Sequence, residues 1–68
     1  METPDKDTQK AIVTQAIKAI EVEAYSLKIA GEAFKTIGIV EKAEEKATQL
    51  ANTMQLHAFY ASKLAELT

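Results

Sequence analysis

The sequence predicts an all-α protein, a long antiparallel helical hairpin that dimerises into a four-helix bundle. The helices are expected over about residues 4–36 and 40–67, within a single domain that comprises residues 1–68. Alanine, the best helix former, occurs twelve times, and Pro4 is the only proline. Apolar residues recur at alternating steps of three and four, which is the spacing of one face of a helix. This spacing loses its phase once, at residues 36–39, where the chain is expected to reverse.

The first helix is expected to begin at Pro4. Thr3 supplies a hydroxyl that can accept a hydrogen bond from the free N–H groups of the first turn, and proline fits the first helical position. Asp5 and Asp7 then lie near the positive end of the helix dipole, where carboxylates are stabilised.

Each predicted helix carries one apolar row with the seven-residue repeat of a coiled coil. In the first helix the row comprises Val13, Ile17, Ile20, Ala24, Leu27, Gly31 and Phe34. In the second helix it comprises Val40, Ala43, Ala47, Leu50, Met54, His57, Ala61 and Leu64. The two rows are expected to form the seam of the hairpin, where valine in place of Gly31 would be overpacked.

Gly38 is the predicted turn residue. The step from Phe34 to Val40 is six residues, so the two rows do not belong to one continuous helix. Glycine takes the left-handed conformation that ends many helices, and Ile39 follows as the residue that folds back on the first helix. Folding about residues 38–39 places Leu27 near Leu50.

Several large apolar residues lie outside these rows, where a two-helix hairpin cannot cover them. Wide apolar stripes are typical of helices with more than one neighbour. The candidate interface residues are Ile12, Ile37, Leu56, Phe59, Tyr60 and Leu67. The alanines beside them are Ala16, Ala19, Ala30, Ala33, Ala51, Ala58 and Ala65. We expect this surface to be covered by a second copy, as a homodimer, or by another helical protein. Phe59 and Tyr60 serve either as anchors for that partner or as a cap on the bundle core.

Composition narrows the functional classes. Eight lysines, no arginine and ten acidic residues give a net charge of -2, whereas a nucleic-acid clamp needs clustered cations. The lack of cysteine excludes disulfides and thiolate metal sites. The polar N-terminus does not match a signal peptide, and no apolar stretch reaches the roughly 18 residues of a membrane span. The expected location is therefore the cytoplasm.

No catalytic, cofactor-binding or metal-binding residues are predicted. The sequence has no nucleophile–histidine–acid set, phosphate-binding glycine loop or zinc spacing, so an enzyme is not expected. His57, one turn after Met54, is interpreted as a seam polar residue that sets register. The alternative is a haem or metal ligand, which would need its symmetry mate nearby. Glu41, Glu44 and Glu45 are interpreted as a solvated face.

The length of the chain, the cysteine-free hairpin, the seven-residue layers and the central turn resemble the Rop-type regulators of plasmid copy number. That resemblance implies a hairpin that dimerises into a four-helix bundle and binds paired RNA loops through a basic face of the first helix. Here the lysines of the first helix alternate with acids: Lys6, Lys10, Lys18, Lys28 and Lys35 against Asp5, Asp7, Glu21, Glu23 and Glu32. These balanced charges do not form the basic face of that family, so nucleic-acid binding is kept only as the alternative function.

Residues 27–50 are also similar to a single tetratricopeptide hairpin. Gly31, Phe34, Gly38 and Ala43 have that family's spacing for small, aromatic, turn and small residues. Ala47 occupies the place of the family's next aromatic residue, and no proline closes the second helix. This resemblance implies a hairpin that docks a partner protein.

The sequence thus favours a small non-enzymatic protein–protein interaction module, either an adaptor, a chaperone-like protein or a regulator. Such a module would act through self-association and through its apolar helix faces. A Rop-like nucleic-acid-binding regulator and a cofactor-binding bundle built on His57 are the competing hypotheses.

Overall fold

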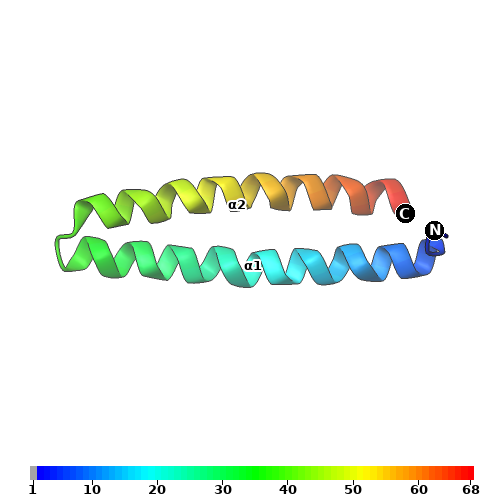
Figure 1. The fold of residues 1–68 in the computed structure, drawn as a ribbon, viewed down its shortest axis with the longest axis horizontal. Helices are drawn as coiled ribbons and strands as arrows, with labels where there is room; N and C mark the ends of the chain where they lie inside the picture. The colour runs from blue at the N-terminus through cyan, green and yellow to red at the C-terminus, as the bar shows by residue number, and fades with distance from the viewer. Residues whose placement is uncertain (1) are drawn as a thin grey trace.

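The computed structural model describes residues 2–68 and consists of two long helices that pack antiparallel (Figure 1). Helix α1 (Lys6–Thr36) has 31 residues and helix α2 (Val40–Leu67) has 28. The two chain ends lie together at one end of a rod that measures 50 × 23 × 14 Å (Figure 1). The predicted all-α hairpin is confirmed.

Helix α1 begins two residues later than predicted, and its cap is Asp5 instead of Thr3. The Asp5 carboxylate accepts a hydrogen bond of 2.8 Å from the backbone N–H of Thr8. Pro4 precedes the cap, and its carbonyl accepts a hydrogen bond from the side-chain amide of Gln9. Threonine and aspartate both cap helices. Asp5 is the cap here because its carboxylate reaches a free N–H group of the first turn.

The turn between the helices is a Schellman motif. Gly38 has a left-handed φ of 83°, the only positive φ among the described residues. The N–H of Gly38 donates to the carbonyl of Lys35 at 3.1 Å, and the N–H of Ile39 donates to the carbonyl of Phe34 at 2.9 Å. These two bonds satisfy carbonyl groups that the end of a helix would otherwise leave unpaired. Helix α2 begins at the next residue, Val40.

The hairpin seam uses the predicted row of α1. All seven of its residues are buried or half-buried, and Val13 and Ile20 are each 8% exposed. In α2, half of the predicted row is wrong. The alternate positions Val40, Ala47, Met54 and Ala61 are exposed, Met54 by 48%. The seam instead contains Lys46, Thr53 and Tyr60, each one residue before the predicted position, and Leu67, which continues the same repeat.

The shift has a steric reason. Gly31 of α1 faces Lys46, and its missing side chain leaves space between the helices. The Cβ of Lys46 lies 3.6 Å from the point where a Cβ on Gly31 would be. Longer side chains opposite small ones fill a seam without voids. Thr53 is 6% exposed, and its hydroxyl donates to the carbonyl of Gln49 at 2.9 Å, so its burial leaves no unpaired polar group.

The seam has room for one methyl group at Gly31. A Cβ at this position would meet its nearest neighbour at an ordinary van der Waals distance of 3.6 Å. The expected overpacking therefore does not apply to alanine at this position.

The core of the hairpin is small for the size of the chain. The solvent-accessible surface of the whole hairpin is 5252 Å². A compact 7.4 kDa monomer exposes about 4,200 Å², so this hairpin exposes roughly 1,000 Å² more than a typical monomer. A standard protein–protein interface buries about 800 Å² on each partner. The surplus is thus of the size that one partner would cover.

Candidate interaction surface

Helix α1 carries a second row with the seven-residue repeat, outside the hairpin seam. We call this row the α1 stripe; it comprises Ile12, Ala16, Ala19, Glu23, Ser26, Ala30, Ala33 and Ile37. The members from Ile12 to Ala33 each precede a seam residue by one, which places the row about 100° around the helix from the seam. Ile37 continues the repeat at the C-cap of α1. Ile12 is 54% exposed and Ile37 is 67% exposed. Ala16 and Ala30 are half-buried, and the other six members are exposed. The α1 stripe is therefore apolar at both ends and mostly uncovered in the monomer.

Helix α2 also carries a second row. We call it the α2 stripe; it comprises Val40, Glu44, Ala47, Ala51, Met54, Ala58, Ala61 and Ala65. All eight residues are exposed, and each follows a seam residue or seam position by one. The α2 stripe contains four of the eight residues that the sequence places in the seam, namely Val40, Ala47, Met54 and Ala61. These four residues do follow a seven-residue repeat, but they do not face α1.

The two stripes lie on opposite faces of the hairpin. A shallow groove between the helices is lined by Lys28 and Lys35 of α1 and by Ala47 of α2. All three come directly after a seam residue in the sequence. Residues that follow a seam residue by one therefore lie on the same face of the hairpin in both helices, and we call it the groove face. The α2 stripe borders the groove face. The α1 stripe, which precedes the seam, lies on the opposite face, which we call the back face.

The predicted interface residues separate into two groups. Ile12, Leu56 and Phe59 are exposed, and because each precedes a seam residue, all three belong to the back face. Ile37, at the C-cap of α1, is also exposed and continues the α1 stripe. Tyr60 and Leu67 are half-buried in the hairpin seam. The ring of Phe59 meets that of Tyr60 edge to face, with 5.4 Å between centroids, so an exposed aromatic rests on a packed one.

The sequence reasoning missed two exposed apolar residues of α1, Val22 and Ile29. They are seven residues apart and border the α1 stripe on its outer side. Their seven-residue spacing could have identified them in the sequence as part of one helix face. They widen the apolar surface around the middle of α1.

His57 bridges the two helices. Its Nε2 lies 3.3 Å from Oε2 of Glu21 on α1. The side chains are 28% and 61% exposed, so this is a partly solvated contact across the hairpin. A partly exposed contact of this kind contributes little to stability. No cluster of three or more metal-ligating side chains occurs in residues 2–68.

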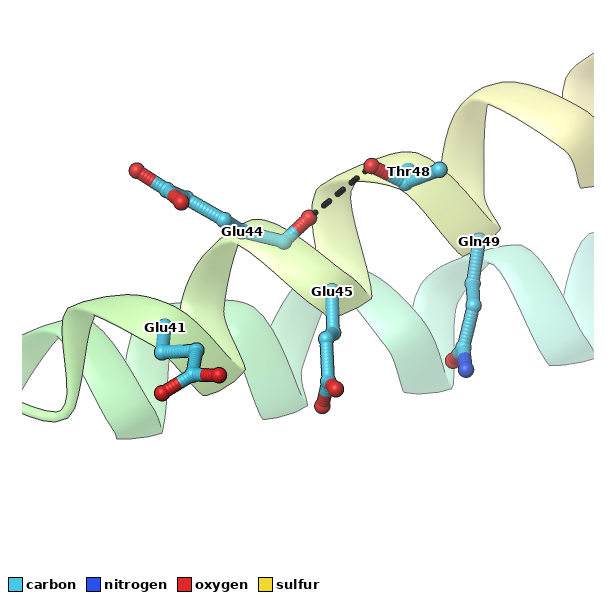
Figure 2. A pocket seen from close by; sticks show the side chains of 5 residues that line it. All are labelled: Glu41, Glu44, Glu45, Thr48 and Gln49. Atoms are coloured by element: carbon cyan, nitrogen blue, oxygen red, sulfur yellow. Dashed lines mark hydrogen bonds between the residues drawn. The ribbon is translucent and has the colours of Figure 1, made fainter.

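An acidic hollow lies at the start of α2. It is lined by Glu41, Glu44, Glu45, Thr48 and Gln49. Figure 2 shows Glu44 directed away from Glu41 and Glu45, and the Thr48 hydroxyl donates to the backbone carbonyl of Glu44 at 3.1 Å. The carboxylates do not converge on one point. Glu41, in the first turn of α2, is stabilised by the positive end of the helix dipole.

Within the part of the chain that the structure describes, neither helix is long and apolar enough to cross a membrane. Comparisons with protein-family models, with curated proteins and with solved structures found no significant match to this chain.

Proposed function

We propose that this protein is a non-enzymatic helical interaction module that works through self-association. The observation that carries the proposal is the pair of exposed stripes. Each helix of the hairpin has one row with the seven-residue repeat against the other helix and a second such row that is mostly exposed. Helices with two such rows are typical of bundles with more than two helices.

The energetics support the same proposal. Four large side chains of the stripes are exposed: Ile12, Ile37, Val40 and Met54. Full burial of one such side chain contributes about 1.5–3 kcal/mol, whereas the whole stability of a domain is about 5–15 kcal/mol. A hairpin whose core consists of Val13 and Ile20 gains a large share of its stability if a partner covers one stripe.

The charges favour a protein partner over nucleic acid. Lys28, Lys35 and Lys46 border the groove together with Glu32, and the hollow at the start of α2 is acidic. A phosphate-binding face needs cations without interleaved acids. The mixed surface supports association between protein helices.

Sedimentation equilibrium of the purified chain tests the proposal, with circular dichroism on the same sample. We expect a helical species of about 15 kDa, twice the chain mass of 7.4 kDa. A helical, stable monomer of 7.4 kDa would contradict self-association. A monomer without helix would also contradict it, and would indicate a different helical protein as the obligate partner.

A further inference from the structure

We infer that the back face is the self-association surface, and that the α1 stripes of two copies pair antiparallel about a two-fold axis midway between residues 24 and 25. This inference rests on the proposed self-association and specifies its geometry. The occupant of the α1 stripe is thus a second copy of the same chain.

The order of residues along the α1 stripe carries the inference. From either end the row begins with isoleucine followed by two alanines, and only its two central residues, Glu23 and Ser26, differ. A two-fold interface requires a surface that is complementary to itself. Antiparallel pairing about the proposed axis sets Ile12 against Ile37 of the second copy and Glu23 against Ser26 of the second copy. The alanine layers between them allow the helices to approach to about 8 Å, the short end of the usual range.

The central layer selects the register. In the proposed register the Ser26 hydroxyl of one copy can donate to the Glu23 carboxylate of the other, and the two-fold axis creates this pair twice. A shift by seven residues sets Glu23 against Ala19 or Ala33 instead. A carboxylate covered without a donor is costly, so the shifted registers are disfavoured.

The charges of α2 on the back face agree with this geometry. Lys42 and Glu45 lie near the turn, whereas Lys63 and Glu66 lie near the C-terminal end, where they form an ion pair of 3.2 Å. An antiparallel second copy brings its Lys63 and Glu66 over Glu45 and Lys42. Opposite charges then meet at both ends of the interface, and the exposed Phe59 is covered between them.

The α2 stripe does not have this symmetry. Val40 lies at one end and Ala65 at the other. Antiparallel pairing along its full length sets Glu44 against Ala61 of a second copy, without a donor. The α2 stripe is therefore the natural alternative interface for a test.

Disulfide trapping distinguishes the two stripes, because the chain has no cysteine of its own. The test variant combines Ala19→Cys with Ala30→Cys, which face each other across the proposed interface. The matched control combines Ala47→Cys with Ala58→Cys, which have the same 11-residue separation and occupy corresponding places on the α2 stripe. Within one chain, residues 11 apart on a helix are about 16 Å from each other, too far for a disulfide. Ala19→Cys alone is a second control, since residue 19 of two copies would be about 16 Å apart along the axis.

After mild oxidation, we expect a covalent dimer from the Ala19→Cys/Ala30→Cys variant on a non-reducing gel. We expect none from Ala19→Cys alone or from the α2 control. If the test variant loses its helical spectrum, Ala16→Cys with Ala33→Cys repeats the test in the adjacent layer.

Efficient trapping through the α2 control would overturn the inference. So would the absence of trapping in a test variant that sediments as a dimer, and either result would leave the proposed self-association intact. A chain that sediments as a monomer overturns both.

Discussion

The two glycines should respond with opposite signs to the same substitution. Gly38→Ala introduces a Cβ that meets nothing within 4 Å, so its whole cost comes from the left-handed φ of 83°. That conformation costs an L-residue about 1–2 kcal/mol. Gly31→Ala lies inside α1, where alanine is favoured over glycine by about 1 kcal/mol, and its Cβ would be in ordinary contact with Lys46 at 3.6 Å. The two variants should therefore differ by roughly 2–3 kcal/mol per chain.

Urea unfolding followed by circular dichroism measures this difference, with all samples at one chain concentration. Gly38→Asn is the matched control, because asparagine tolerates the left-handed conformation better than alanine does. It should lose less stability than Gly38→Ala. If both alanine variants shift the midpoint in the same direction, the assignment of one glycine to the turn and the other to a helix interior is refuted.

Three further predictions concern the seam, the bridge between the helices and the helix cap. Ile20→Ala should reduce the free energy of unfolding by about 2–5 kcal/mol, whereas Met54→Ala should change it by less than about 0.5 kcal/mol, since Met54 faces solvent on the groove face. Equal losses of both variants in urea unfolding would mean that Met54 packs in the seam, as the sequence predicts. A double-mutant cycle on Glu21→Gln and His57→Gln should give a coupling of about 0.2–1 kcal/mol that falls in high salt, as expected for an exposed pair; a larger, salt-independent value would mean that the contact is buried. Hydrogen bonds from the side chain and the backbone N–H of Thr8 lower the pKa of Asp5, so the stabilisation by this carboxylate is present above the ordinary pKa of aspartate and is lost as the pH falls through the lowered value. The stability advantage of the native chain over Asp5→Asn should accordingly shrink in acid, and an advantage that stays constant down to pH 2 would contradict the role of the Asp5 charge.

The helices and their order could be predicted from the sequence because the evidence for them is local. Alanine-rich rows with a seven-residue repeat indicate long helices, and the loss of phase before Val40 marks the turn at Gly38. The start of α1 could not be predicted to the residue, because Thr3 and Asp5 are both good caps and only the formed turn decides between them.

The orientation of α2 about its own axis could not be predicted, because it depends on the shape of α1. Ala47 and Met54 are better seam residues than Lys46 and Thr53 if hydropathy alone is considered. Opposite Gly31, however, the longer stem of Lys46 fills the space between the helices, and Thr53 is buried with its hydroxyl bonded to the carbonyl of Gln49. The same rotation determines which apolar residues remain outside, so the candidate interface was also only partly predictable.

The dependence of stability on chain concentration tests the central claim most directly. If a second copy covers an exposed stripe, folding and association are coupled. The apparent free energy of unfolding, per mole of dimer, should then rise by about 1.4 kcal/mol for each tenfold increase in chain concentration. The urea midpoint, measured by circular dichroism over a hundredfold range of chain concentration, should rise accordingly. A sharp unfolding transition with the same midpoint at every concentration would contradict the account.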